Sequence, residues 1–161
     1  MRDEAFERLY CEHAQSLYAF LSYRTGDRVL AEDLLADTFE RALRARRRFD
    51  PRKASEKTWL YAIALNRLRD QVRRGAAEGR ALERVAVGAV GGSSGGIEEI
   101  SDRDLVGRGL QSLSEDEREA IALRFGGDLT VPEIAKLTNE PLTTVEGRVY
   151  RALRKLRKAI D

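Results

Sequence analysis

The sequence is poor in the residues that build covalent cross-links, metal sites and membrane spans. Its 161 residues include one cysteine, one histidine, one tryptophan and three prolines. The single cysteine, Cys11, excludes a disulfide within the chain and favours a reducing compartment. One histidine leaves too few ligands for a typical metal centre, so we expect no metal and no cofactor. No apolar run is long enough to cross a membrane and no signal sequence begins the chain, which predicts a soluble, cytoplasmic protein.

The net charge is also small, at +2, because the sequence has 29 Lys and Arg residues and 27 Asp and Glu residues. The charges are nevertheless segregated along the chain. Acidic residues gather at 3–7, 98–104 and 115–119, and basic residues at 41–53, 67–80 and 148–158. This blockwise pattern indicates separate surfaces for separate partners. A glycine-rich phosphate loop and an acid/base cluster are both missing, so we do not expect an enzyme.

Apolar residues recur at helical spacing in the first half of the chain and predict three helices, at about 4–23, 27–47 and 55–74. Asp27 and Ser55 are the expected N-terminal caps of the second and third helices. Pro51 is expected to end the second helix before the third begins. These helices have enough apolar surface for a small bundle that folds alone. The expected apolar faces consist of Phe6, Leu9, Tyr10, Leu17, Phe20 and Leu21; Leu30, Leu34, Leu35, Phe39, Ala42 and Leu43; and Trp59, Leu60, Ile63, Ala64, Leu68 and Val72.

A change in composition divides the chain. Residues 75–100 include the run GAVGGSSGG, which is typical of a flexible linker. Two short helices are predicted beyond it, at 102–112 and 115–125, the second with a capping box formed by Ser114 and Glu117. The sequence therefore predicts an all-α chain with two small helical domains, a three-helix bundle at 1–74 and a second domain at 101–161.

The segment 129–161 has the pattern of a helix-turn-helix. Thr130 and Glu133 form a second capping box, with Pro132 in the first turn of a short helix. Asn139 lies where the chain must turn and tolerates the left-handed conformation. A last helix is expected to follow, capped by Thr143 or Thr144.

The last helix is expected to be apolar on one side and basic on the other. Its apolar side holds Val145, Val149, Ala152, Leu153 and Leu156, and its basic side holds Arg148, Arg151, Arg154, Lys155, Arg157 and Lys158. A basic run alone is usually a solvated face. Together with the capped turn before it, this run indicates docking on nucleic acid.

Three motifs in register resemble the extracytoplasmic-function (group 4) bacterial sigma factors, the promoter-specificity subunits of RNA polymerase. AEDLLADTFERALR (31–44) resembles the region 2.1–2.2 helix, TWLYAIALNRLRDQVRR (58–74) resembles region 2.3–2.4, and LQSLSEDEREAIALRF (110–125) with the helix-turn-helix resembles region 4. The resemblance covers nearly the whole chain outside the linker. It implies that the partners are core RNA polymerase (its β′ clamp helices and β flap), promoter DNA and an anti-sigma factor, and that the free chain is a monomer.

The resemblance assigns the polymerase contact to Asp33, Leu34, Asp37, Phe39 and Glu40. Asp33, Asp37 and Glu40 form an acidic stripe at i, i+4 and i+7, which suits a basic partner. Such a stripe is also typical of a solvated helix face, and Phe39 is more typical of a core than of an interface.

The segment 49–58 and the helix after it match the part of the family that opens and reads the −10 element. Asn66 matches the asparagine of the family's I-A-x-N motif, and its amide both donates to and accepts from a base edge. Trp59 suits stacking on DNA, although a core position is more typical. Arginines here would follow phosphates or form a solvated surface. The implied −10 contacts are Phe49, Lys57, Asn66, Arg67, Arg69, Arg73 and Arg74.

Region 4 of the family places the last helix in the major groove of the −35 element. Residues at the start of such a helix face base edges, and later ones hold phosphates. Arg148 is suited to donate two hydrogen bonds to guanine, and Glu146 is suited to accept one from the amino group of cytosine. The implied base contacts are Thr143, Thr144, Glu146, Gly147 and Arg148, and the implied phosphate contacts are Arg151, Arg154 and Lys155.

Some residues depart from the family pattern. Ala36 stands where glutamine is usual, Glu56 where an aromatic is usual, and Ala62 where arginine is common. Glu146 occupies an often basic position, and glycine is frequent at the positions of Asn139 and Thr143. The departures predict an unusual promoter preference.

Two other functions stay open on the sequence alone. A sigma-like mimic would sequester a regulator without starting transcription, although the intact basic surfaces argue against it. A stand-alone helix-turn-helix repressor would bind palindromic DNA as a dimer, whereas a sigma factor is expected to read asymmetric DNA as a monomer.

Overall fold

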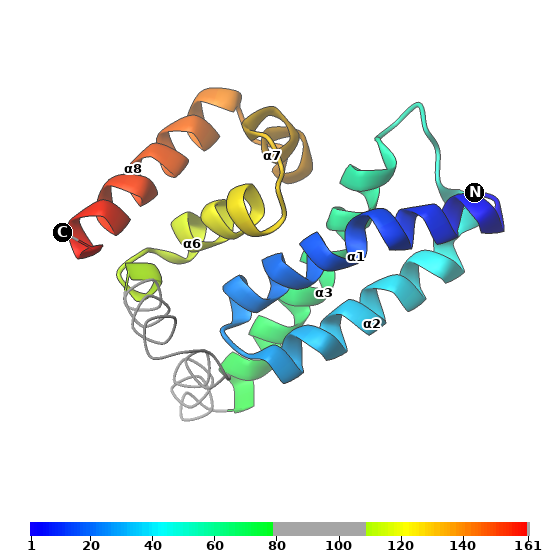
Figure 1. Cartoon of the computed structure of the whole chain (residues 1–161), viewed down its shortest axis with the longest axis horizontal. Coiled ribbons are helices and arrows are strands. Elements are labelled where there is room, and N and C mark those ends of the chain that lie inside the picture. The colour runs from blue at the N-terminus through cyan, green and yellow to red at the C-terminus, as the bar shows by residue number, and fades with distance from the viewer. Residues whose placement is uncertain (79–108, 161) are drawn as a thin grey trace.

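The computed structural model describes residues 1–78 and 109–160. Its helices are α1 (Asp3–Thr25), α2 (Arg28–Ala45), the short 3₁₀ helix η1 (Arg46–Arg48), α3 (Glu56–Glu78), α6 (Glu115–Ile121), the π-helical turn η3 (Ala122–Gly126), α7 (Val131–Thr138) and α8 (Leu142–Ile160). No strand occurs in these two ranges, which confirms the all-α prediction. Figure 1 shows α1–α3 gathered in one bundle and α6–α8 in a second group beside it.

The expected capping residues begin the helices. The Asp27 carboxylate accepts the N–H groups of Val29 and Leu30 at 3.0 and 3.2 Å. Ser114 and Glu117 form the predicted capping box, in which the Glu117 N–H donates to Ser114 Oγ at 3.2 Å and the Ser114 N–H donates to Glu117 Oε1 at 2.9 Å. These bonds satisfy amides that every helix leaves unpaired in its first turn, so local sequence was sufficient to place these helix starts.

Several helix ends and faces differ from the prediction. Helix α3 continues to Glu78 instead of ending near Arg74, because a helix tolerates one glycine, here Gly75, at a cost of about 1 kcal/mol. Tyr10, Leu43 and Val72 are exposed, since the apolar stripes are wider than the faces that neighbouring helices cover. Of the predicted helix at 102–112, residues 109–111 are helical and 102–108 lie outside the described residues, as does 79–100 of the predicted linker.

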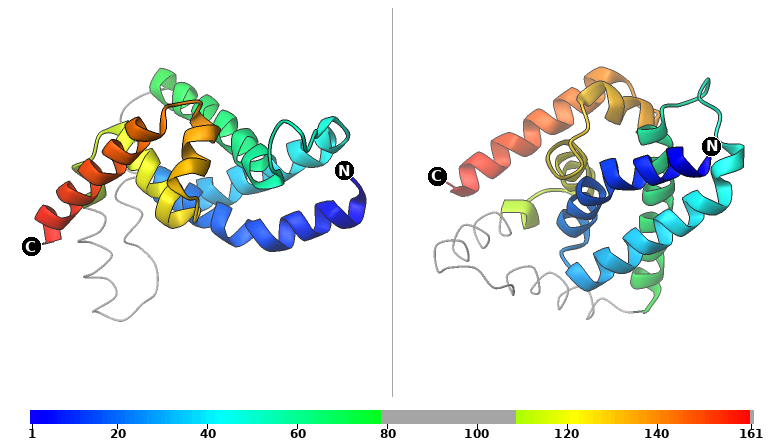
Figure 2. Two further views of the ribbon diagram at one scale, coloured as in Figure 1. Left: turned by 90° about the horizontal axis from the view of Figure 1, so that it is seen from above. Right: turned by 45° about the vertical axis from the view of Figure 1, so that its right-hand side comes forward.

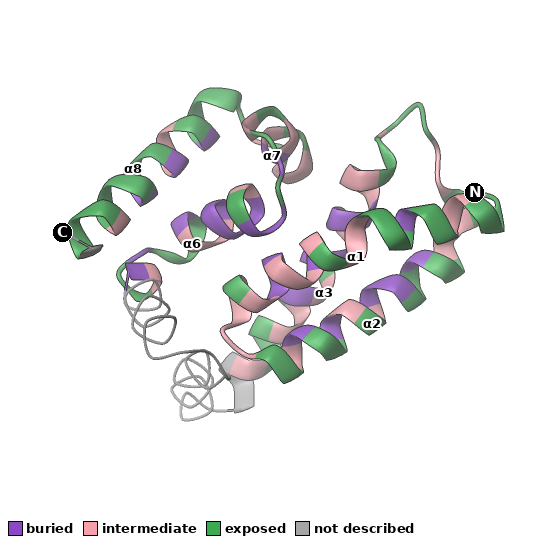
Figure 3. Cartoon of the chain, viewed as in Figure 1, coloured by how far each residue is buried: buried purple, intermediate pink, exposed green. Residues whose placement is uncertain are grey.

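One hydrophobic core runs through both groups of helices, which the sequence analysis did not anticipate. Tyr61 of α3 is fully buried, with its ring centroid 5.9 Å from that of Phe20 in α1. Its hydroxyl donates to the Gly127 carbonyl at 3.2 Å, and burial raises the Tyr61 pKa to about 12. Buried positions line the facing sides of both groups (Figure 3). The bundle at the N-terminus and the helix-turn-helix unit therefore stabilise one another.

The most extensive contact between the two groups joins α1 and η3, which both views of Figure 2 place side by side. A Cβ atom added at Gly126 would lie 3.0 Å from the Phe20 Cα atom and 3.1 Å from the Phe20 nitrogen. These distances are tighter than nine in ten real Cβ contacts, so the α1 backbone would have to shift by a few tenths of an ångström. Glycine at this position therefore sets how tightly the two groups pack.

Candidate nucleic-acid interface

The predicted helix-turn-helix is formed by α7 and α8. Asn139 ends α7 in the left-handed conformation, with φ of 55°, as its sequence position predicted. Val145 and Ala152 of α8 are fully buried and Val149 is nearly so. Leu153 is exposed, because it lies at the rim of the apolar side of α8. The opposite side of α8 faces solvent along its length (Figure 3).

Helix α8 begins at Leu142, two or three residues earlier than a cap at Thr143 or Thr144 would place its start. Thr143 and Thr144 therefore lie within its first turn, and the Thr144 N–H donates to the Pro141 carbonyl at 3.1 Å. Their side chains are exposed, as are those of Glu146, Arg151 and Arg154. The structure thus brings most of the predicted −35 contacts onto one solvent-facing helix.

Arg148 is the exception among the predicted base contacts, because it is held by a carboxylate within the chain. Its Nη1 and Nη2 atoms donate to the two oxygens of Glu140 at 2.8 and 2.6 Å. The guanidinium lowers the Glu140 pKa to about 2 through this hydrogen bonding. A base contact by Arg148 requires this pair to break. No helical spacing rule joins Glu140, in the turn, to Arg148, so sequence reasoning missed it.

Lys155 is also engaged within the protein. Its ammonium donates to Glu117 Oε1 at 2.7 Å and ties α8 to the start of α6. The Glu117 side chain is nearly buried, and hydrogen bonds from Lys155 and from the Ser114 N–H lower its pKa to about 2. Charge-assisted bonds of this kind are stronger than neutral ones, so Lys155 has a structural role in this conformation.

Helix α3 and the segment before it position the predicted −10 contacts. Asn66, Arg69, Arg73 and Arg74 are exposed on α3. Arg67 is half-buried and paired with Asp37 of α2. Phe49, in the segment before α3, packs on Trp59 in the first turn of α3 with ring centroids 5.2 Å apart, and both are partly buried. Lys57 is half-buried against the turn before α7.

The predicted polymerase contacts divide into surface and core. Asp33 and Glu40 are exposed on α2, and Asp37 is half-buried between Arg67 and Arg41. Leu34 and Phe39 are 1% and 6% exposed, so they cannot touch a partner while the bundle is folded. The Phe39 ring instead contacts the ring of Tyr10, with centroids 4.8 Å apart. The sequence pattern places both residues on the core-facing stripe, and the structure corrects their proposed role.

A cleft of about 650 Å³ separates α3 from α6. Asn66 and Arg69 line it from α3, and carboxylates of α6 line the other side. Across the described ranges, no group of three or more His, Cys, Asp or Glu residues could hold a metal ion. None of the helices in those ranges is long and apolar enough to span a membrane.

Comparisons with known proteins match both groups of helices. Residues 9–78 match the family model Sigma-70 region 2, and residues 103–156 match the model Sigma-70, region 4. The chain is 31% identical over 162 residues to the ECF RNA polymerase sigma factor RpoE of Cereibacter sphaeroides, covering 98% of this chain and 87% of the relative. It is 30% identical to the ECF RNA polymerase sigma factor BldN of Streptomyces coelicolor, with 98% of this chain covered, and it spans 61% of that relative's length.

Among solved structures, the chain resembles CnrH in a complex with the cytosolic domain of CnrY. The TM-score is 0.70, the identity is 28%, and the match covers 99% of this chain and 90% of CnrH. The structural match, the sequence relatives and both family models all identify the two helical groups as parts of a sigma factor. The chain belongs to the extracytoplasmic-function sigma factors, the subunits that direct RNA polymerase to promoters.

Proposed function

We propose that this sigma factor reads the −35 duplex with α8 and the opened −10 strand with α3, while α2 docks on the β′ clamp helices and region 4 meets the β flap. The observation that carries this proposal is the two-sided α8. Its apolar side packs into region 4 through Val145 and Ala152, which are fully buried. Its other side exposes Thr143, Thr144, Glu146, Arg151 and Arg154 to solvent along the helix that follows the capped turn. Helices presented in this way enter the major groove.

Base reading is assigned to the exposed first turns of α8, through Thr143, Thr144, Glu146 and Gly147. Arg151 and Arg154 hold phosphates further along. Arg148 and Lys155 join them only where their carboxylate partners release them. Asn66, Phe49 and the arginines of α3 hold the unstacked strand, and Asp33, Asp37 and Glu40 meet the polymerase.

The polymerase supplies the phosphoryl-transfer chemistry, so the proposed role has no catalysis, cofactor or metal in this chain. We also propose that the chain works in the cytoplasm, where the polymerase acts, and that an anti-sigma factor holds it in check. The likeness to CnrH, whose structure contains the cytosolic domain of CnrY, supports that partner. When free of partners, the chain is proposed to be a monomer.

Transcription with purified core RNA polymerase tests the assignment. With a pool of promoter fragments, we expect start sites that share spaced −35 and −10 motifs. Replacing Asn66 by alanine is expected to reduce initiation about 10-fold or more, because a base edge loses its hydrogen-bond partner. Gln15→Ala, which removes an exposed amide on α1 outside both surfaces, is the control and should leave initiation unchanged. Stable core binding without initiation would favour the mimic, and DNA binding without core affinity would favour the repressor.

Salt dependence tests the phosphate assignment on α8. For holoenzyme binding to an initiating promoter, Arg151→Ala combined with Arg154→Ala is expected to make the slope of log K against log salt shallower by about 2, since each lost phosphate contact removes about one unit. Arg8→Ala removes an exposed arginine of α1 and should leave the slope unchanged. An unchanged slope in the α8 variant would show that other cations hold the duplex.

A further inference from the structure

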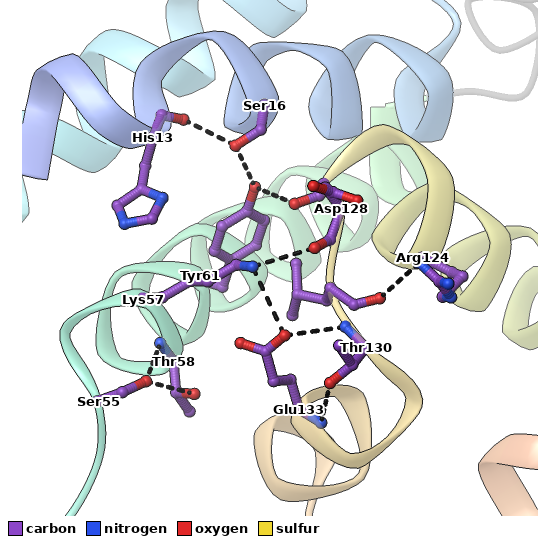
Figure 4. Close-up of polar contacts among 12 residues, drawn as sticks. His13, Ser16, Ser55, Lys57, Thr58, Tyr61, Arg124, Asp128, Thr130 and Glu133 are labelled. Atoms are coloured by element: carbon purple, nitrogen blue, oxygen red, sulfur yellow. Dashed lines mark hydrogen bonds and ion pairs between the residues drawn. The ribbon is translucent and has the colours of Figure 1, made fainter.

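The turn between α7 and α8 holds Glu140 in a fixed position. Helix α7 is capped at its start by Thr130 and Glu133, as Figure 4 shows, and at its end by Asn139, whose left-handed backbone reverses the chain. The Glu140 N–H then donates to the Ala135 carbonyl at 3.0 Å, which is the closing bond of a Schellman motif. Because both ends of α7 are tied down, a well-anchored backbone presents the Glu140 carboxylate to α8.

Glu140 and Arg148 form a bidentate pair that uses both terminal nitrogens of the guanidinium. Nη1 and Nη2 donate to the two carboxylate oxygens at 2.8 and 2.6 Å, and only 15% of the Arg148 side chain and 28% of the Glu140 side chain are exposed. An arginine reads guanine with the same kind of fork, through two donors to O6 and N7. Arg148 therefore does not read guanine in this conformation, because its fork is already occupied.

The charges around the pair keep it ionised. The hydrogen bond with Glu140 raises the Arg148 pKa, and the charges of Asp116 and Glu119 in α6 act in the same direction. Hydrogen bonding from Arg148 lowers the Glu140 pKa to about 2. Both groups are therefore charged throughout the physiological pH range, so that a proton does not open the pair there. A competing hydrogen-bond partner would have to do so.

Arg148 starts from the face of α8 that is proposed to enter the groove. Thr144 lies four residues before it and Arg151 three residues after it, so the three side chains leave the helix along one strip. Thr144 and Arg151 are exposed. The position of Arg148 on the helix thus suits a DNA contact, and only its guanidinium is turned back toward the turn that carries Glu140.

Glu146, two residues earlier, is in the opposite condition. Its side chain is exposed, and its carboxylate has no hydrogen bond or ion pair with the residues that the structure describes. Residues i and i+2 of a helix do not face each other, so Arg148 does not neutralise it. The first two turns of α8 therefore offer hydroxyls and an uncompensated carboxylate, while their one cation is held. Such a set favours bases that present an amino group, namely cytosine and adenine.

We propose that Glu140 determines the specificity of the −35 readout by withholding Arg148 from the major groove. While the pair is closed, guanine at the base facing Arg148 gains no contact, and the element is read through amino groups instead. This inference rests on the proposed −35 role of α8. Glu140 touches no base, so it is a positioning residue that acts through Arg148. A guanine cannot easily take its place, because hydrogen bonds between two charged groups are stronger than those to a neutral base.

Holoenzyme binding to a promoter pool tests the proposal. The pool is the initiating promoter with its −35 element randomised, and the bound fragments are sequenced. Glu140→Gln keeps the size of the side chain and removes its charge, so we expect the released Arg148 to give a guanine preference of about 5-fold or more at one −35 position where the wild type has none. Asp128→Asn is the matched control, because it removes one exposed carboxylate from the turn before α7 and should keep the wild-type preference.

Arg148 variants show whether the new preference comes from the released arginine. Glu140→Gln combined with Arg148→Ala should lose the guanine preference again. Arg148→Ala alone should bind all fragments more weakly, because the unpaired Glu140 then repels phosphates, but it should rank them as the wild type does. A guanine preference that persists in the double variant, or a changed ranking in Arg148→Ala, would overturn the proposal.

A loss of stability does not mimic these results. A variant that merely unfolds more readily binds every fragment more weakly and leaves the order of preferred bases as it was. Glu140→Ala leaves no acceptor in the side chain, so it covers the case in which glutamine still holds Arg148, and it should give the same guanine preference. If neither Glu140 variant changes the ranking, the proposal is wrong.

Failure of the inference is distinguishable from failure of the proposed function. If the wild-type holoenzyme selects a −35 motif that both Glu140 variants share, Glu140 does not determine specificity, and α8 remains the reader of the −35 element. If the wild type selects no −35 motif although it still initiates at a −10 motif, the assignment of α8 is wrong and the inference fails with it.

Discussion

Replacing Phe20 by alanine is expected to lower the free energy of unfolding by about 3–5 kcal/mol, whereas the same replacement at Phe125 should change it by less than about 1 kcal/mol. Phe20 is fully buried, with its ring 5.9 Å from that of Tyr61 of α3 and its backbone close to Gly126 of η3. Its removal leaves a cavity in the core that both groups of helices share. Phe125 is 55% exposed and contacts Arg124, so its ring buries little surface.

The position of Phe20 also predicts which parts of the chain lose stability. Because the core is shared, region 2 and region 4 should weaken together. Fluorescence of Trp59, the single tryptophan, reports on region 2 during urea unfolding, and hydrogen exchange of the α8 amides reports on region 4. Both probes should shift in the Phe20→Ala variant. If only the fluorescence transition moves, region 4 is stable without α1, and the shared core contributes nothing to it.

Local chemistry explains why so much of the fold could be predicted from the sequence. Asp27, Ser114 and Thr130 start helices because their side chains accept amides two or three residues ahead. Asn139 turns the chain because it tolerates a positive φ. Each of these interactions lies within one turn of helix, where spacing alone determines which groups meet. The all-α class and the helix-turn-helix followed from them.

The packing of the two regions could not be predicted by the same reasoning. Gly126 and Phe20 lie 106 positions apart in the sequence, and neither has a local feature that points to the other. The expectation of a bundle that folds alone came from its apolar stripes, which gave no sign that α1 also covers η3. Contacts of this kind depend on which faces of two finished units fit together, and a single sequence carries no record of that fit.

The candidate site shows the same division. The resemblance and the helical spacing put Thr143, Thr144 and Asn66 on surfaces, where the structure has them. They did not reveal the ionic partners, because Glu140 and Glu119 reach Arg148 and Arg69 across turns and between regions. An arginine whose carboxylate partner is distant in sequence cannot be told apart, from the sequence alone, from an unpaired arginine. The predicted basic surfaces were therefore overestimated at the residues that carboxylates already hold.

Acid is expected to destabilise region 4 progressively as the pH falls from about 4.5 to about 2. Glu117 and Glu140 have pKa values of about 2, lowered chiefly by hydrogen bonds from Lys155 and Arg148, against 4.5 for an unperturbed glutamate. A lowered pKa stabilises the fold above pH 4.5, and that stabilisation is lost progressively as the pH falls from 4.5 to 2. At pH 3 the loss is about 1–2 kcal/mol per carboxylate, allowing for solvent screening at the partly exposed Glu140.

Thermal unfolding followed between pH 7 and pH 3 separates these two carboxylates from the rest. Glu117→Gln combined with Glu140→Gln should be less stable than the wild type at pH 7, because Lys155 and Arg148 lose charged partners, yet its stability should change less on acidification. Glu7→Gln combined with Glu32→Gln removes two exposed carboxylates and should keep the wild-type pH dependence. An equally steep acid transition in the Glu117/Glu140 variant would mean that other groups set it. Since both pairs anchor α8, the predicted acid loss bears directly on the helix assigned to the −35 element.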